Sequence, residues 1–190
     1  MQFKEKYGPW AIIAGSAEGL GESWSRALAA RGINLVMVDN QEEKLQLLGS
    51  ELEEKAGISC KCLSIDLSDT DAWEKIMEAA KGFDCRLLIY NAAYSLIKPF
   101  SSIKDHELDN FCEINVSTQL KLVHAFANHL LENNQAGGII MMSSLAGLLG
   151  MQLVAPYAAT KAFAWNLAEA LHHELKPHNI DVMACIAGAT

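Results

Sequence analysis

The 190-residue sequence lacks an apolar run of the roughly 18 residues that a membrane-spanning helix needs. Its first residues, Met1 to Lys6, are mostly polar, and no apolar segment typical of a signal peptide follows them. Basic residues are in the minority, with 15 Lys and Arg against 23 Asp and Glu and a net charge of -8. Because phosphate backbones are bound by clustered Lys and Arg, the composition predicts a protein that binds neither nucleic acid nor membranes.

Cysteine is also scarce, and its pattern excludes a disulfide framework. The five cysteines are odd in number and scattered through the chain, which is typical of reduced thiols in a cytoplasmic protein: Cys60, Cys62, Cys85, Cys112 and Cys185. Cys60 and Cys62 are close neighbours, but no second Cys or His pair follows at metal-ligand spacing. We therefore expect small, buried, apolar side chains here and no metal site.

The chain does contain a regular alternation of apolar runs and helical stretches. The expected strands are Trp10–Ala14, Asn34–Val38, Ile58–Ile65, Arg86–Tyr90, Gly138–Met142 and Ile180–Ile186. The expected helices are 21–31, 41–55, 71–81, 105–133 and 155–175. Strands that are apolar on both faces and alternate with helices predict an α/β fold, a doubly wound parallel sheet of order 3-2-1-4-5-6. Without a linker or repeat, residues 1–190 form one domain, and the ligand is expected at the carboxyl ends of the strands.

The first strand leads into a glycine-rich turn that suits a pyrophosphate. Glycine permits a tight turn and a close approach of the backbone, and the free N–H groups at the start of the next helix favour an anion. We expect this turn to contact a dinucleotide through Gly15, Ser16, Glu18, Gly19, Leu20 and Gly21. The spacing is GxxxGxG, and a simple connection between a strand and a helix remains the alternative.

An acid follows the second strand at the position where adenosine ribose is bound in such folds. Asp39 could accept hydrogen bonds from both ribose hydroxyls and would repel a 2′-phosphate. Glu18 adds a second negative charge, and Asn40 rather than Lys or Arg follows Asp39. These charges favour NAD over NADP, although Asp39 could instead be a helix N-cap.

Three further positions follow later strands. Asp66 could bond an adenine amino group with help from the backbone of Leu67, or it could be a cap, and these two interpretations carry equal weight. Asn91 and Ala92 follow the fourth strand, where a small side chain lets the backbone pass close to a cofactor.

Four polar residues form a candidate catalytic set. Tyr157 and Lys161 lie one helical turn apart, so the ammonium can stabilise the phenolate and also reach a ribose hydroxyl. Ser144 follows the fifth strand, where it could orient a substrate carbonyl or cap a turn. Asn115 lies inside a long helix, an unfavourable place that a helix kink holding a water near Lys161 would explain. A Tyr-Lys pair alone is a weak signal, because most are surface contacts.

In this order, the motifs resemble those of the short-chain dehydrogenase/reductase family. The family's TGxxxGxG is similar to Ala14–Gly21 with Ala14 in place of Thr, and its NNAG matches Asn91 and Ala92 only. Its helix Asn, Ser and YxxxK are matched by Asn115, Ser144, Tyr157 and Lys161, and its PG is similar to Ala187–Gly188 without the Pro.

The resemblance implies a reversible reduction of a carbonyl to an alcohol. Tyr157 would be the general acid and base, and Lys161 would stabilise the phenolate and bind the nicotinamide ribose. Ser144 would hold the carbonyl oxygen, Asn115 would support a proton relay, and Gly188 would contact the cofactor. The family also implies a homodimer or homotetramer formed through the two longest helices, with Phe163, Trp165 and Leu167 as candidate contacts.

The resemblance to the family does not include the family's last structural elements. The family's seventh strand, the helix before it and its substrate-covering segment have no counterpart before Thr190. Strand six is therefore expected to form an exposed sheet edge, unless a partner subunit or a longer product covers it. A catalytically silent nucleotide-binding module, or a truncated relic, is the alternative to an active enzyme, and a purely structural protein ranks last.

The sequence gives only one indication of the substrate, the apolar residues in certain loops. Apolar residues gather in the loops expected beside the nicotinamide, namely Tyr94, Leu96, Leu145, Leu148, Leu149, Met151 and Leu153. An apolar carbonyl or alcohol substrate would suit such a pocket, and ordinary packing would explain the same residues.

Overall fold

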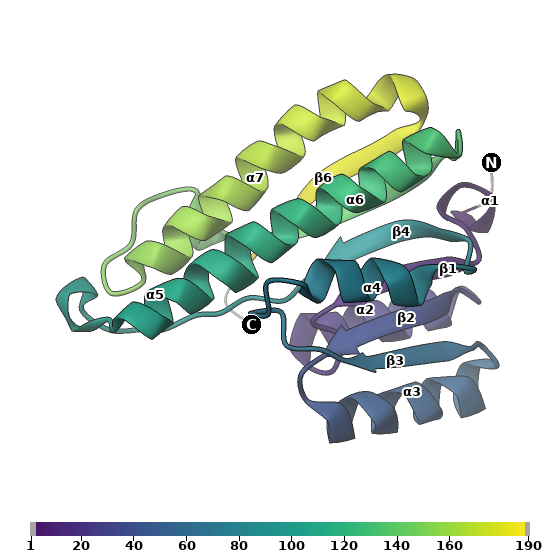
Figure 1. Ribbon diagram of the computed structural model, residues 1–190, viewed down its shortest axis with the longest axis horizontal. Helices are drawn as coiled ribbons and strands as arrows, with labels where there is room; N and C mark the ends of the chain where they lie inside the picture. The colour runs from purple at the N-terminus through teal and green to yellow at the C-terminus, as the bar shows by residue number, and fades with distance from the viewer. Residues whose placement is uncertain (1–2, 189–190) are drawn as a thin grey trace.

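The computed structural model describes residues 3–188, which contain one parallel sheet of order β3-β2-β1-β4-β5-β6 (Figure 1). The strands are β1 Trp10–Ala14, β2 Asn34–Asp39, β3 Cys60–Ser64, β4 Cys85–Tyr90, β5 Gly137–Ser144 and β6 Ile180–Ala187. The predicted fold class and strand order are thus confirmed. Within the described residues β6 is an edge strand, and Met183 and Ile186 on it are 52% and 39% exposed.

Helices cover both faces of the sheet. The helices are α1 Phe3–Tyr7, α2 Gly19–Ala29, α3 Glu42–Ala56, α4 Ala72–Ala80, α5 Asp105–Cys112, α6 Thr118–Glu132 and α7 Ala155–Leu175. Residues of α2 and α3 pack around Ile13 and Met37, whereas residues of α4, α6 and α7 pack around Ile12 and Val36. Because neighbouring strand residues point to opposite faces, both must be apolar in a sheet that is covered twice. None of the helices between residues 3 and 188 has the length and apolar character needed to cross a bilayer.

The helix expected over residues 105–133 is interrupted by a π-helical turn at Glu113–Ser117. Tyr90, the last residue of β4, is fully buried, and its hydroxyl donates a hydrogen bond of 2.5 Å to the Ile114 carbonyl inside this turn. Burial raises the pKa of the Tyr90 phenol. The protonated hydroxyl therefore ties the end of β4 to the π turn.

The short helix α1 was not expected from the sequence. A five-residue helix is unstable alone, and this one is held by tertiary contacts. The Tyr7 hydroxyl donates to Asp181 at 2.6 Å, Lys6 forms an ion pair with the same carboxylate, and the Tyr7 ring fills the space above Gly138. The amino end of the chain is thereby fixed to β5 and β6.

Other boundaries differ by small amounts. Strand β3 covers 60–64 rather than 58–65, because its ladder with β2 joins only Leu35–Asp39 to Cys60–Ser64. Helix α2 begins at Gly19, two residues earlier than expected, so its first turn lies inside the glycine motif.

Replacing Tyr90 with Phe should lower the free energy of unfolding by about 1–3 kcal/mol, because the bond from the buried Tyr90 hydroxyl to the Ile114 carbonyl would be lost. Urea denaturation measures the change. Tyr94→Phe is the matched control, because no described residue bonds the Tyr94 hydroxyl, and it should change stability by less than about 0.5 kcal/mol. Equal losses in both variants would contradict this role of Tyr90.

Candidate active site

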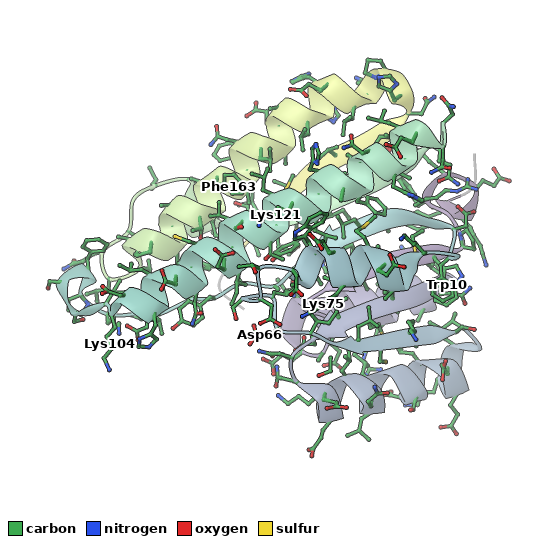
Figure 2. The ribbon with its side chains drawn as sticks, in the orientation of Figure 1. Trp10, Asp66, Lys75, Lys104, Lys121 and Phe163 are labelled. Atoms are coloured by element: carbon green, nitrogen blue, oxygen red, sulfur yellow. The ribbon has the colours of Figure 1, made fainter. Side chains whose placement is uncertain are left out.

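A cavity of about 400 Å³ opens at the carboxyl ends of β1 to β4. Figure 2 shows Asp66 in the loop after β3, at the end of the sheet opposite Trp10. Eight of the residues expected to bind a dinucleotide line this cavity: Gly15, Glu18, Leu20, Asp39, Asp66, Leu67, Asn91 and Ala92. The lining also includes Asn40, Gln41, Ile65, Ala93 and Ile114. The sequence analysis gives Gln41, Ile65 and Ile114 no role in binding, although Ile65 and Ile114 each adjoin a candidate residue.

The glycine turn is packed too tightly for larger side chains. Gly15 has a φ of +79°, and a Cβ on it would lie 2.6 Å from the Ala92 backbone. A Cβ on Gly21 would lie 1.8 Å from the Gly15 carbonyl oxygen. The Asn91 side chain donates to this same oxygen at 2.7 Å, so the turn is bonded to the residue that follows β4.

The amino end of α2 borders the cavity through Glu18 and Leu20. The first N–H groups of a helix lack intrahelical partners, and in the described part of the chain the side chain of the N-cap residue Glu18 makes no capping bond to α2. A Cβ on Gly19, the first residue of α2, would meet no atom within 4 Å, which leaves open space beside these N–H groups. The donor set thus fits a pyrophosphate.

Ser16 lies apart from the cavity surface. It is fully buried, and both its N–H and its hydroxyl donate to the Val38 carbonyl, at 3.1 and 3.3 Å. With its donors used in this way, Ser16 holds the turn against β2, and its contact with a dinucleotide remains a prediction.

Asp39 is not the N-cap of α3, because that position is Gln41 and no side-chain cap bond is present, so the ribose-binding role remains a prediction. Its Oδ2 accepts from the Ala17 N–H at 2.9 Å, and its Oδ1 accepts from the Gln41 N–H at 3.1 Å. The buried carboxylate thus braces two loops and still lines the cavity. Because each carboxylate oxygen can accept a second hydrogen bond, ribose hydroxyls can still be bound.

The cavity lining carries negative charge only. It includes the carboxylates of Glu18, Asp39 and Asp66 and no Lys or Arg. Lys44 lies 2.7 Å from Glu18, and this hydrogen bond lowers the pKa of the Glu18 carboxyl. The Lys44 ammonium, which lies outside the lining, is therefore already engaged by one of these acids.

Asp66 has the bonds of a turn-capping residue. Its Oδ1 accepts from the Ser68 N–H at 2.9 Å and from the Ser68 hydroxyl at 2.8 Å. The Leu67 carbonyl accepts from the Thr118 hydroxyl at 3.0 Å. The capping role is therefore present, and Asp66 is exposed enough on the cavity side to contact a ligand as well.

Tyr157 and Lys161 lie on adjacent turns at the beginning of α7. The Lys161 Nζ is 5.5 Å from the centre of the Tyr157 ring and donates to the Met142 carbonyl at 2.7 Å. Lys161 is only 6% exposed, and burial lowers the pKa of its ammonium to about 8. The tyrosine ring is half-buried and faces this cation.

The end of β5 is fastened to the same helix. The Ser143 hydroxyl donates to the Lys161 carbonyl at 2.8 Å, and a Cβ on Gly147 would lie 2.7 Å from the Lys161 backbone. Ser144 Oγ accepts from the Ala146 N–H at 3.3 Å, which caps a short 3-10 turn at Leu145–Gly147. The Ser144 hydroxyl hydrogen has no acceptor among the described residues and is available to a substrate.

Asn115 lies in the π turn, so the expected distortion of the helix is present. The side chain is 3% exposed and bonds Tyr94 twice, accepting from its N–H at 2.7 Å and donating to its carbonyl at 2.9 Å. It also donates to the Thr160 hydroxyl at 3.0 Å. The water expected near Lys161 remains a prediction, and sequence reasoning had given Thr160 no role.

Gly188 lies at a second cavity of about 390 Å³, lined by Leu20, Ser23, Trp24, Met142, Cys185, Ala187 and Gly188. Leu20 lines both cavities, so the start of α2 separates them. Nine of the residues expected to bind a dinucleotide thus line these two cavities. The others line neither of them, namely Ser16, Gly19, Gly21, Tyr157 and Lys161.

Several large apolar side chains on the described surface are exposed. They lie on the loops after β4 and β5 and include Ile97, Phe100, Leu145, Leu149, Met151 and Leu153. The Lys98 N–H donates to the Leu153 carbonyl at 2.9 Å, which joins the two loops. Leu153 has a φ of +69°, a left-handed conformation that is unfavourable for leucine.

The chain is similar to curated oxidoreductases. It is 32% identical over 190 residues to the 7beta-hydroxysteroid dehydrogenase of Clostridium sardiniense, covering 100% of this chain and 72% of that protein. It is 33% identical over 196 residues to the very-long-chain 3-oxoacyl-CoA reductase of Debaryomyces hansenii, covering 98% of this chain and 57% of that protein. The chain therefore spans between about half and three quarters of these relatives.

Solved structures have the same architecture. A 7beta-hydroxysteroid dehydrogenase structure matches with a TM-score of 0.94 and 31% identity, over 100% of this chain and 73% of that one. A short-chain dehydrogenase from Sphingobium yanoikuyae in complex with NADPH matches with a TM-score of 0.91 and 26% identity, over 96% of this chain and 71% of that one. The family model for short chain dehydrogenases matches residues 9–190. From its motifs, its sheet and these matches, the chain belongs to the short-chain dehydrogenase family.

Proposed function

We propose that this protein interconverts a carbonyl and an alcohol with NAD(H) as the hydride carrier. The observation that carries the proposal is the buried Lys161 ammonium, 5.5 Å from the Tyr157 ring and bonded to a backbone carbonyl rather than to a carboxylate. An ammonium without an anionic partner is costly to bury. A phenolate that forms beside it during the reaction would benefit from this charge.

The reduction needs one hydride and one proton, and bound nicotinamide would supply the hydride. The Tyr157 hydroxyl donates its proton to the substrate oxygen, which turns the phenol into a phenolate. The Lys161 ammonium stabilises that phenolate, and the Ser144 hydroxyl donates a hydrogen bond to the same substrate oxygen. In the oxidation, the phenolate takes the proton back from the alcohol.

To test this function, turnover is measured in the parent protein and in a variant that lacks the proton donor, Tyr157→Phe. The parent protein should oxidise NADH in the presence of bulky apolar ketones, and Tyr157→Phe should lower kcat by about 100-fold or more, the range assigned to acid–base catalysis. NADH binding, followed by its fluorescence, should remain in the Phe variant. Binding of NADH by a parent protein that turns over no member of a broad carbonyl panel would favour the catalytically silent module instead.

We propose NAD(H) rather than NADP(H) because of the charges around the first cavity. A 2′-phosphate near Asp39 would meet the carboxylates of Glu18, Asp39 and Asp66, and the Lys44 ammonium is already paired with Glu18. The Sphingobium yanoikuyae neighbour holds NADPH, so the shared fold alone does not select a cofactor. Local electrostatics are the basis for the choice.

The parent protein should bind NADH at least about tenfold more tightly than NADPH, a difference of about 1.4 kcal/mol. Asp39→Asn should weaken NADH binding by about 10- to 100-fold, because a charged acceptor contributes about 1.5–3 kcal/mol. Fluorescence titration measures both constants. Asp69→Asn is the control, since Asp69 pairs with Lys75 outside the cavity lining and should leave both affinities unchanged. Tighter binding of NADPH by the parent would contradict the assignment.

The buried Lys161 should also make stability depend on pH. Its pKa is lowered from the ordinary value of 10.5 to about 8 in the folded protein. Below pH 8 the folded and the unfolded chain both carry the proton, and folding bears the full cost of the buried charge. Between about pH 8 and 10.5 only the unfolded chain keeps the proton, so this contribution makes stability rise with pH.

Lys161→Met should therefore raise the free energy of unfolding at pH 7 by roughly 3 kcal/mol, the equivalent of a shift of this size, while abolishing turnover. Urea denaturation at pH 7 and at pH 9.5 measures the effect, and the gain should shrink at the higher pH. A Met variant that is less stable than the parent at pH 7 would show that Lys161 is held by favourable interactions instead.

For the substrate we propose a bulky apolar ketone or alcohol. The exposed apolar side chains on the loops after β4 and β5 would contact such a molecule, and the relatives' names refer to a steroid and to a very-long-chain acyl thioester. We also propose a homodimer or homotetramer formed along α6 and α7, which run beside each other across one face (Figure 1). Phe163 and Trp165 are half-buried on α7, whereas Leu167 packs against the core.

A further inference from the structure

We infer that Thr160 is a positioning residue for Tyr157, through a hydrogen-bonded connection that joins β4, the π turn and the first turn of α7. The inference rests on the proposed function, in which Tyr157 transfers the proton. Thr160 itself touches neither substrate nor cofactor in this proposal, and it acts on where the Tyr157 backbone is held.

The Thr160 hydroxyl uses both of its hydrogen-bonding capacities. It donates to the Tyr157 carbonyl at 2.9 Å and accepts from the Asn115 side-chain amide at 3.0 Å. The residue is only 9% exposed, so water offers little replacement for either bond. A threonine that bonds a carbonyl of its own helix is common, but the second bond, to another helix, is what gives this one a tertiary role.

Asn115 is itself fixed in place. Its amide nitrogen donates to the Tyr94 carbonyl and its oxygen accepts from the Tyr94 N–H, so both donors of the amide have partners when Thr160 is included. The preceding residue, Ile114, is held by the Tyr90 hydroxyl at 2.5 Å. Thr160 is therefore connected to the end of the sheet through groups that are each held by hydrogen bonds of their own.

The first turn of α7 needs an external support of this kind. Tyr157 is the third residue of the helix, where N–H groups have no intrahelical partner and helix ends fray. The N-cap position is Val154, which offers no capping side chain, and Leu153 before it has the unfavourable φ of +69°. Pro156 favours the helical backbone in this first turn, but no side chain caps it at the N-cap position, so contacts from outside add to what holds Tyr157 in place.

The test compares Thr160→Val with Thr160→Ser. Valine keeps the volume but loses both hydrogen bonds, whereas serine keeps the hydroxyl. We expect Thr160→Val to lower kcat at saturating NADH by tenfold or more with little change in the KM for NADH, and Thr160→Ser to stay within about threefold of the parent. Thr118→Val is the matched control, because Thr118 is also a buried threonine, at the start of α6, and its hydroxyl bonds the Leu67 carbonyl. It should lose stability to a similar degree while keeping its kcat at saturating NADH.

A kcat of Thr160→Val equal to that of the parent, or an equal loss in Thr160→Ser and Thr118→Val, would overturn the inference. If the parent shows no turnover, the proposed function fails, and the connection is then tested without activity. Amide hydrogen exchange of the peptide covering 155–161 should be faster in Thr160→Val than in the parent or in Thr160→Ser. Equal exchange in all three proteins would overturn the positioning role as well.

Discussion

The burial of the Lys161 ammonium at the carboxyl end of β5 is the constraint on which the candidate catalytic centre depends. A lysine charge is unfavourable away from water, and here its nitrogen bonds one backbone oxygen, that of Met142. The arrangement requires α7 to lie very close to β5, which the Ser143 hydroxyl and the missing side chain of Gly147 permit. The close approach in turn brings Tyr157 and Ser144 to the same end of the sheet. Burying the Lys161 ammonium thus lowers the stability of the fold, and it leaves a positive charge without an anionic partner beside Tyr157, the candidate acid and base.

The first cavity has the opposite charge: its lining, among the described residues, contains three carboxylates and neither Lys nor Arg. Asp39 belongs to both the architecture and the site, because its two oxygens hold the glycine turn and the loop before α3 while facing the cavity. Asn91 has a similar double position, since it bonds the Gly15 carbonyl. Residues that shape the backbone and also line a cavity keep it formed in advance, which would lower the entropic cost of binding a ligand there.

The π turn between α5 and α6 links these two parts of the protein. Ile114 lines the first cavity, whereas its neighbour Asn115 bonds the Thr160 hydroxyl on α7. An inserted residue in a helix is unfavourable unless its surroundings compensate, and both Tyr90 and Tyr94 provide hydrogen bonds here. The π turn thus holds the first cavity and the beginning of α7 in fixed positions relative to each other.

The sequence by itself determined the parallel sheet, its strand order and the identity of the principal polar residues. Apolar periodicity and the spacing of glycines are local properties, and strict alternation of strands and helices leaves few topologies. It could not determine α1, whose stability comes from Asp181 far along the chain, or the partners of Asn115. It also left the alternatives for Asp39 and Ser144 open, and the structure gives both residues backbone partners as well as a place beside the site. The tertiary structure was needed for α1, for Asn115 and for the bond between Asp39 and Ala17, because these depend on atoms that are distant in sequence and meet only when the sheet and its helices have packed. The bond between Ser144 and Ala146 is local, and it forms because the chain turns directly after β5.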